Sequence, residues 1–344
     1  MSNIRQQTIQ SLIQNKILKL KGNGLLIHHW DTDGICSAAL LLKRLHQCTI
    51  TNETPTLGNY FLTEHELSDY SKYDFVLVAD MALPKDQILT LSAHAPVFIF
   101  DHHLQDIISE VNHYNPISLG EKPTEYPSAS WIVNQLLQNP VNLFALLGIV
   151  GDHEHNIKNN AAFFSLITEF CTQHTLTFDD LMMMVSLLDA NYKLGEKQVV
   201  EDAPHYLLAH SSPQDILINR RWKNNLEKLQ TEIQKILKTP PEHTHDLLIK
   251  NIHTPYNIIS TITRKIFWDS GVDTIVINTG FFPDKDQLYV RSKKNMQPMI
   301  VQGRKLGYKA GGKQEVLGAI IPKEHTQEFL TEIITFLTSK HQRK

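Results

Sequence analysis

Short apolar runs alternate with helix-like segments along the first half of the chain. Residues 25–27, 75–79 and 97–100 are continuous apolar runs of strand length, whereas residues 37–45, 143–150 and 160–210 have helical spacing. Such an alternation is typical of a parallel sheet whose two faces are both buried. We therefore predict a doubly wound α/β domain. Residues 1–21 have an amphipathic pattern, and we expect them to form a helix that packs on this domain and not on a membrane.

The pattern changes beyond residue 210. Residues 219–238 form a charged helix with one apolar face, and a Pro-Pro pair at 240–241 ends it. Strand-like runs then recur at 247–252, 274–278, 288–291 and 316–321, with helical segments at 258–268 and 324–340 and a glycine-bearing turn region at 303–312. We predict an N-terminal domain over residues 1–210, a helical linker over 211–241, and a smaller α/β domain over 242–344.

A polar cluster follows each of four apolar elements in the first domain. These clusters are residues 28–34, Asp80, residues 101–103 and residues 151–153. Ligands of open α/β sheets bind in the crevice outside the carboxyl ends of the strands, so we expect the four clusters to meet in one site. A single Asp after a strand is more often a turn residue. The prediction of a site therefore depends on the four clusters together.

The residue types in these clusters are those of metal ligands. Asp31 and Asp33 are two residues apart, on one side of an extended segment, and His29 shares that side while His28 points away. This geometry is the only reason to prefer His29 over His28. Imidazole and carboxylate together suit manganese, iron or zinc. Carboxylates this close together repel one another unless cations bind between them. Two divalent cations joined by a bridging carboxylate are a common active-site arrangement in enzymes that hydrolyse phosphate esters.

The formal net charge of −3 hides an asymmetry along the chain. Residues 31–160 carry 16 acidic and 6 basic residues, a balance of −10, whereas residues 285–313 carry 8 basic residues and one acidic residue, a balance of +7. Basic residues interleaved with Tyr289 and Tyr308 suit single-stranded nucleic acid, although a solvated surface is an equally common explanation. The pairs Arg291–Ser292 and Gly311–Gly312 favour a phosphate site. We expect this segment to face the same cleft as the acidic clusters.

Three features exclude other classes of protein. The cysteines (Cys36, Cys48 and Cys171) form no CxxC pair, which argues against a cysteine-based zinc site and favours a reducing compartment. No apolar run approaches the roughly 20 residues of a membrane span. The N-terminus has no signal-peptide core. We expect a cytoplasmic protein that does not bind membranes.

The clusters resemble the motifs of the DHH phosphoesterase superfamily. Residues 29–34 with 37–40, Asp80, residues 101–103 and residues 148–152 correspond in order and approximate spacing to its four motifs. Residues 289–292 and 311–312 are similar to the associated DHHA1 domain, so the resemblance spans nearly the whole chain. The first motif resembles that of RecJ-type exonucleases and their small archaeal relatives more than that of the nanoRNases.

The resemblance implies a phosphodiesterase with two manganese ions, or with Mg²⁺ or Co²⁺, that acts on single-stranded DNA or RNA or on short oligonucleotides. It implies that Asp80 bridges the ions, that His103 contacts the scissile phosphate or assists the leaving group, and that Asp101 orients a neighbouring imidazole. The implied ligands are His29 and Asp31 for the first ion and Asp33, His102 and Asp152 for the second, and the implied substrate-binding residues are Arg291, Ser292, Gly311, Gly312 and Lys313.

One departure and two alternatives qualify this hypothesis. Lys313 stands where the family has a histidine after Gly-Gly; lysine still binds phosphate as a point charge, so the departure bears on substrate preference more than on chemistry. One alternative is a cyclic-dinucleotide or mononucleotide phosphodiesterase. The other is a non-catalytic nucleic-acid-binding partner of the replisome, which the complete ligand set disfavours. The residues identify no protein partner in replication or repair.

Overall fold

The computed structural model describes residues 2–339, with side chains from residue 8 onward, and the chain divides into two compact units. The first unit comprises Met1–Tyr192 and Glu196–Leu226, and the second comprises Lys193–Gly195 and Glu227–Lys344. The predicted linker over 211–241 contains α10 (Pro213–Ile218) and α11 (Arg220–Lys238). The division falls within α11, so the three-part boundaries stay a prediction.

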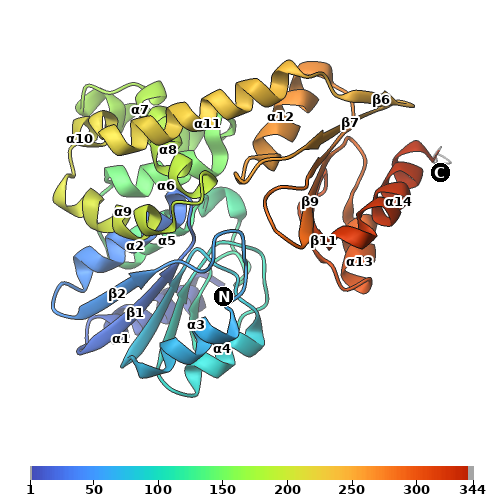
Figure 1. The fold of residues 1–344 in the computed structure, drawn as a ribbon. Coiled ribbons are helices and arrows are strands. Elements are labelled where there is room, and N and C mark those ends of the chain that lie inside the picture. The colour runs from blue at the N-terminus through green and yellow to red at the C-terminus, as the bar shows by residue number, and fades with distance from the viewer. Residues whose placement is uncertain (1, 340–344) are drawn as a thin grey trace. The chain divides into compact units, whose positions relative to one another are not determined.

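A five-stranded parallel sheet forms the centre of the first unit (Figure 1). Three of its strands follow the predicted apolar runs, and the predicted α/β fold with a parallel sheet is confirmed. The two outer strands were not predicted, because one is polar and half-exposed and the other has only three residues. In spatial order the strands are β2 (Thr49–Glu53), β1 (Asn23–His28), β3 (Phe75–Ala79), β4 (Val97–Phe100) and β5 (Asn112–Tyr114).

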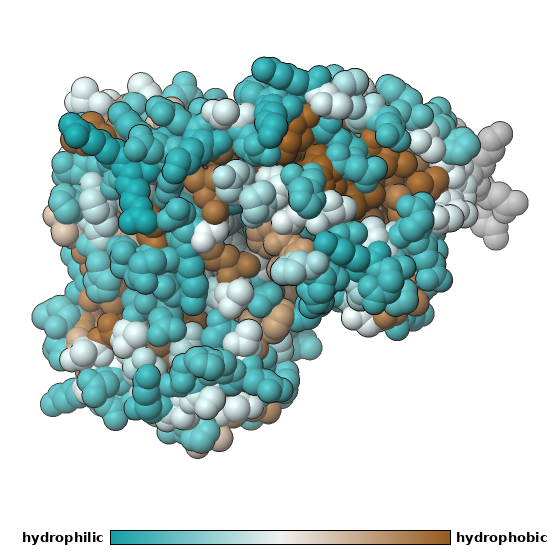
Figure 2. All heavy atoms as spheres, viewed as in Figure 1, coloured by the Kyte–Doolittle hydropathy of each residue, from teal (hydrophilic) through white to brown (hydrophobic). Residues whose placement is uncertain are grey.

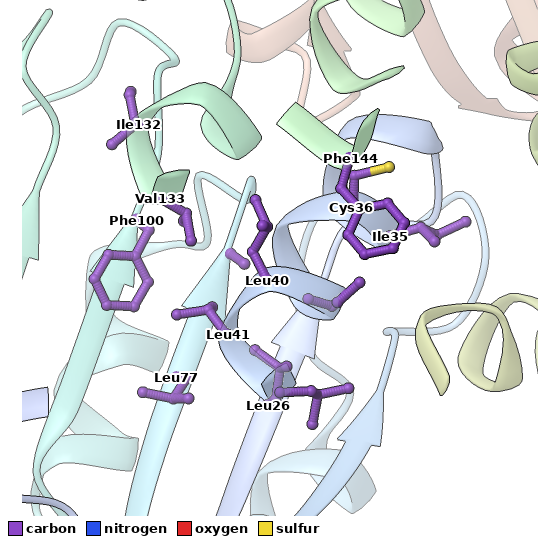
Figure 3. Packing of buried hydrophobic residues seen from close by; sticks show 14 of the residues in the cluster. Leu26, Ile35, Cys36, Leu40, Leu41, Leu77, Phe100, Ile132, Val133 and Phe144 are labelled. Carbon is purple, nitrogen blue, oxygen red and sulfur yellow. The ribbon is translucent and has the colours of Figure 1, made fainter. Parts of the chain in front are cut away.

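Helices cover both faces of this sheet. On one face, the apolar side of α2 (Thr32–Arg44) packs against β1 and β3, where Leu40 and Leu41 lie beside Leu26 and Leu77 (Figure 3). On the other face, α4 (Lys85–Ser92) packs against β4 and contacts α3 (Glu64–Asp69). The remaining helices of this unit before α10 are α5 (Ala129–Leu136), α6 (Leu143–His153), α7 (Ala161–Gln173), α8 (Phe178–Lys193) and α9 (Lys197–Ala209).

The N-terminal helix α1 (Ser2–Ile17) packs on the first unit as expected. It contacts β5 and α5, and Ile13 and Ile17 are buried, whereas Leu12 is 57% exposed. The part of the predicted amphipathic pattern that falls on residues 1–7 lies outside the described side chains. None of the described helices combines the length and the apolar character that a membrane span requires. Hydrophilic side chains cover most of the first unit's surface in the view of Figure 2.

The second unit is built on a six-stranded mixed sheet. In spatial order its strands are β10 (Lys309–Gly311), β11 (Val316–Pro322), β9 (Lys285–Arg291), β8 (Thr274–Asn278), β7 (Leu247–Ile252) and β6 (Glu242–Thr244). The pair β7 and β8 is parallel, and the other pairs are antiparallel. Helix α12 (Ile259–Ser270) packs on β8 and β9, α13 (Gln297–Lys305) packs on β10 and β11, and α14 (Thr326–Thr338) is the last helix. The predicted turn region at 303–312 is wrong in part, because it holds the end of α13 and the short strand β10.

Candidate metal centre

The strand order places the candidate site. In the order β2-β1-β3-β4-β5, the chain leaves β1 toward one edge of the sheet and leaves β3 toward the other. Loops that diverge in this way open a crevice at the carboxyl ends of the two strands, and ligands of doubly wound proteins bind there. His29 directly follows β1 and Asp80 directly follows β3, so both begin at this crevice.

The start of α2 separates the two carboxylates of the first cluster. Asp31 caps the helix, with its Oδ1 accepting a hydrogen bond from the Gly34 N–H at 3.1 Å, and Asp33 lies in the first turn. The prediction of an extended segment with both carboxylates on one side is therefore wrong. Gly34 permits the tight turn, because a Cβ there would lie 2.3 Å from the carbonyl oxygen of His29. Asp31 is thereby directed toward His29 and Asp33 toward His102.

The first group of candidate ligands contains His29, Asp31 and Asp80. The His29 Nδ1 lies 2.8 Å from Asp31 Oδ2 and 3.6 Å from Asp80 Oδ2. One ligand atom from each residue lies within 4.8 Å of the others. His28 is fully buried elsewhere, with Nδ1 2.6 Å from the carbonyl oxygen of His29 and Nε2 3.2 Å from the Asn52 amide nitrogen. Of the two histidines, only His29 lies in the cluster.

The second group contains Asp33, His102 and Asp152. The His102 Nε2 lies 3.0 Å from Asp152 Oδ2, 3.9 Å from Asp33 Oδ2 and 3.5 Å from Asp80 Oδ1. Asp80 therefore directs one carboxylate oxygen at each group. Its backbone has φ of 60°, in the left-handed region that Asp tolerates better than most residues and that occurs often at functional sites.

Residues far along the chain hold the Asp33 carboxylate in place. Its two oxygens accept backbone N–H hydrogen bonds from Ala129 (2.6 Å) and Ser130 (2.9 Å), at the N-terminus of α5. Gly148 of α6 leaves the room for this carboxylate, since a Cβ there would lie 2.2 Å from Asp33 Oδ1 and 2.0 Å from Ser130 Oγ. The sequence pattern did not predict the role of α5 or of Gly148, whose missing side chain leaves room for Asp33. The available signals were Ser128, which caps α5, and a glycine in the middle of an apolar helix.

Asp101 and His103 form a third group with Asp80 and His102, and one ligand atom from each of the four residues lies within 4.8 Å of the others. The His103 Nδ1 lies 2.7 Å from Asp101 Oδ1, which also accepts the backbone N–H groups of His102 and His103 at 2.8 and 3.3 Å. Asp101 is fully buried, whereas the His103 side chain is 51% exposed. Asp101 thus contacts the neighbouring imidazole as the predicted orienting role requires, and His103 presents its ring to solvent beside Asp80.

The electrostatics of the cluster reflect crowded negative charge. Burial, together with repulsion from Asp33 and Asp31, raises the pKa of Asp80 well above its usual range. Burial and the nearby Asp152 carboxylate raise the pKa of Asp33 to about 6. Burial lowers the pKa of His102, but the contacts with Asp152 and Asp80 outweigh it and raise the pKa well above the usual value. The site therefore favours added positive charge.

This donor set fits two divalent cations. Nitrogen and oxygen ligands bind such ions at about 2.0–2.2 Å, so the ligand atoms of one ion lie within about 4.4 Å of each other. Each of the first two groups supplies one imidazole and carboxylates whose ligand atoms lie within 4.8 Å of one another, close to that limit. Mixed imidazole and carboxylate ligands suit manganese, iron or zinc better than calcium.

In the second unit, Arg291 lies at the end of β9. Its guanidinium carbon lies 5.3 Å from the centre of the Trp268 ring and 5.9 Å from that of Phe267, distances at which cation–π attraction acts. The neighbouring Ser292 is fully buried, and its hydroxyl donates to Asp273 Oδ2 at 2.7 Å. The Ser292 hydroxyl is therefore already engaged within the unit.

The glycine pair follows two different constraints. Gly311 has no atom within 4 Å of the position that a Cβ would take, so the backbone there is open to a ligand. Gly312 has φ of +146°, and a Cβ would lie 2.1 Å from the carbonyl oxygen of Val316. Gly312 is thus required by the turn between β10 and β11, and Lys313 follows it as an exposed side chain.

Comparisons with known proteins agree with this architecture. Residues 25–167 match the sequence model of the DHH family, N-terminal domain. The fold is similar to the DHH domain of a member of the s1p family of ribosomal proteins, with 14% identity over 99% of this chain and 92% of that one, and a TM-score of 0.71. It is also similar to exonuclease RecJ bound to manganese, with 14% identity, 98% and 95% coverage and a TM-score of 0.68.

A third similar structure is the pGpG-specific phosphodiesterase PggH from Vibrio cholerae, with 15% identity over 92% of this chain and 98% of that one, and a TM-score of 0.50. No curated protein sequence matches the chain. The fold is α/β, and residues 25–167 are matched by the DHH family, N-terminal domain. Over nearly the whole chain, the fold is similar to that of exonuclease RecJ.

Proposed function

We propose that the protein is a manganese-dependent phosphodiesterase that hydrolyses single-stranded nucleic acid or short oligonucleotides at a two-metal site. The position of Asp80 carries the proposal. Its two carboxylate oxygens lie 3.6 Å from His29 Nδ1 and 3.5 Å from His102 Nε2, so one buried side chain joins two groups of metal-ligand type. The similarity of the fold to RecJ bound to manganese supports the choice of metal and substrate class.

The proposed roles follow from the two groups. When bound, a pair of divalent ions supplies an activated water and stabilises the charge that develops on the phosphate. Asp101 holds the Nδ1 of His103, which leaves Nε2 to contact the scissile phosphate or to give a proton to the leaving oxygen. The proposed ligands are His29, Asp31 and Asp80 for one ion and Asp33, His102, Asp152 and Asp80 for the other.

The second unit is proposed to bind substrate phosphates. Arg291 can make a bidentate phosphate contact, and its packing on Trp268 reduces the freedom it would lose on binding. The open backbone at Gly311 admits a phosphate closely, and Lys313 adds a point charge. Gly312 shapes the turn that carries these two residues, and Ser292 is proposed to act by fixing the end of β9.

The proposal is tested with a panel of oligonucleotides. DNA and RNA of graded length, with 5′- or 3′-blocked ends, are incubated with Mn²⁺, Mg²⁺ or Co²⁺. We expect hydrolysis with Mn²⁺ and binding of two Mn²⁺ per chain by calorimetry. Asp80→Ala should abolish hydrolysis and lower the metal stoichiometry, whereas Asp202→Ala, an exposed carboxylate on α9, should do neither. Failure of the wild-type protein to degrade any member with Mn²⁺ would refute the proposal.

A second candidate function is the hydrolysis of a dinucleotide, either linear or cyclic. The similarity to a pGpG-specific phosphodiesterase favours it. The same panel separates the two candidates when pGpG and a cyclic dinucleotide are included. Hydrolysis confined to dinucleotides would support the second candidate, and degradation of longer oligomers would support the first. The complete set of candidate ligands argues against a non-catalytic binding protein.

A further inference from the structure

Two large side chains beside the candidate metal centre are unusually exposed. Tyr60 is 62% exposed and Leu104 is 86% exposed, and they are among the most exposed large hydrophobic residues in the described chain. Leu104 directly follows His103, and Tyr60 contacts His29. An exposed aromatic ring beside a phosphodiesterase site can stack on a nucleic-acid base.

The Tyr60 ring lies against the first ligand group. It stacks on the His29 ring at 5.7 Å between centres with an angle of 29° between the ring planes. It also meets the buried Trp30 ring at 5.1 Å and 59°. One side of the ring is thus supported by His29 and Trp30, while most of the side chain is exposed to solvent. This arrangement offers a flat aromatic surface next to a metal ligand.

The loop that carries Tyr60 is braced on both sides. Before it, Thr56 donates its N–H to Glu66 Oε1 at 2.9 Å. After it, Leu62 donates its N–H to Gln87 Oε1 at 2.8 Å, and its carbonyl oxygen accepts from Gln87 Nε2 at 2.7 Å. Leu62 is itself buried. The exposure of Tyr60 therefore belongs to an anchored loop, which lowers the entropy cost of using the ring for binding.

The segment that carries Leu104 is braced in the same way. The carbonyl oxygen of His103 accepts from Asn115 Nδ2 at 2.7 Å, and the carbonyl oxygen of Gln105 accepts from Ser118 Oγ at 2.6 Å. The side chain between these two anchors projects into solvent. Its direction is set by the same backbone that orients His102 and His103.

The strand order places these two side chains on opposite sides of the site. Tyr60 follows β2, Leu104 follows β4, and β1 and β3, which lead to His29 and Asp80, lie between those strands in the sheet. We propose that Tyr60 stacks on the base of one nucleoside and Leu104 contacts the nucleoside on the other side of the scissile phosphodiester. The preferred substrate then has a nucleoside on each side of the cleaved bond. This inference rests on the proposed function.

The test measures whether Tyr60 and a base act together. The manganese-loaded protein is assayed on a dinucleotide and on the same compound with one or the other base removed. Tyr60→Ala should raise KM for the complete dinucleotide about tenfold, within the roughly 5- to 150-fold range of base–aromatic stacking. Removal of the stacked base should abolish the difference between Tyr60→Ala and wild type. Tyr60→Phe keeps the ring and should restore the wild-type KM.

Leu104→Ala should show the same coupling with the opposite base. Ile218→Ala serves as the matched control, because Ile218 is 63% exposed on α10, away from the described ligands, and its loss should leave KM unchanged. An equal KM for Tyr60→Ala and wild type on the complete dinucleotide would overturn the inference. So would a rise in KM that persists after either base is removed.

A second measurement separates this inference from the proposed function. A dinucleotide that contains 2-aminopurine is mixed with each variant, and quenching of its fluorescence reports stacking without any need for hydrolysis. Quenching by wild type and Tyr60→Phe but not by Tyr60→Ala supports the stacking of a base on Tyr60, even if no bond is cleaved. Absence of hydrolysis refutes the proposed function, and absence of a Tyr60-dependent change in fluorescence refutes the stacking.

Discussion

Replacing Gly148 with alanine is expected to weaken one of the two proposed metal sites by at least tenfold while leaving the protein folded. The new methyl carbon would lie 2.2 Å from Asp33 Oδ1 and 2.0 Å from Ser130 Oγ. Both distances are far below contact, and the Ser130 Cβ at 2.9 Å limits how far its hydroxyl can retreat. Asp33 must therefore leave its two backbone donors, Ala129 and Ser130, or α6 must move away from α5.

The expected change in stability is small because two effects oppose each other. Alanine stabilises a helix interior by about 1 kcal/mol relative to glycine. Overpacking a core by one methyl group costs about 1–3 kcal/mol. The free energy of unfolding should therefore fall by no more than about 2 kcal/mol. The expected effect on metal affinity is larger. Replacing a residue that only supports a metal ligand commonly lowers metal affinity by about 10- to 100-fold, and this substitution displaces a proposed ligand itself.

The assay combines urea unfolding with calorimetric titration of Mn²⁺ into the purified protein. Gly151→Ala is the matched control, because it lies one helical turn further along α6 and its methyl carbon would approach Thr32 Cβ no closer than 3.1 Å. We expect Gly151→Ala to bind two ions at wild-type affinity. Gly148→Ala should bind one ion at wild-type affinity and the other at least 10-fold more weakly. Two ions bound by Gly148→Ala at wild-type affinity would refute the packing argument.

Three further predictions concern other parts of the chain. Burial lowers the pKa of His28 from its ordinary 6.5 to about 4, so between these pH values the unfolded chain binds a proton that the folded protein does not. The free energy of unfolding should therefore be unaffected by His28 above pH 6.5 and should fall by about 3 kcal/mol as the pH is lowered to 4. Urea unfolding measures this loss, which His28→Asn should lack. Asp189→Ala removes the acceptor of the Thr32 N–H and hydroxyl (3.1 and 2.7 Å) and should lower the free energy of unfolding by about 1–2 kcal/mol, while Asp189→Asn, with one acceptor oxygen, should lower it less; equal losses would contradict this. Arg291→Lys keeps the charge but loses bidentate binding and packing on Trp268, so KM for an oligonucleotide should rise about tenfold, and an unchanged KM would remove Arg291 from the substrate site.

The first sheet was predictable in its centre and not at its edges. A central parallel strand is buried on both faces and reads as an unbroken apolar run, as in β1, β3 and β4. The edge strand β2, Thr49–Glu53, is polar and half-exposed, so its composition resembles that of a loop. Its pairing with β1 comes from the neighbouring strand and not from any pattern of its own.

The contrast between His29 and Asp33 shows how far local geometry extends. Alternation along an extended chain separates His29 from His28, because the His29 N–H still donates to the Ala79 carbonyl oxygen at 3.1 Å, directly after β1 ends. The same rule failed two residues later, since α2 begins at Thr32 and the helix turns Asp33 away from Asp31. Side chains alternate between two sides only while the chain stays extended. Asp31, a residue type that commonly caps helices, was the available signal that a helix begins there.

The placement of Asp33 depends on contacts that no local pattern contains. Its oxygens bind the N–H groups of Ala129 and Ser130, 96 and 97 residues further along the chain. The sequence does contain one indirect sign of this contact. Gly148 lies within an otherwise apolar helix, at a position where alanine would make the helix more stable. A glycine in that position is stabilising only if a neighbouring group needs the space of its missing side chain. The group that needs it here is a proposed metal ligand, so the helix gives up part of its own stability to keep Asp33 directed at the site.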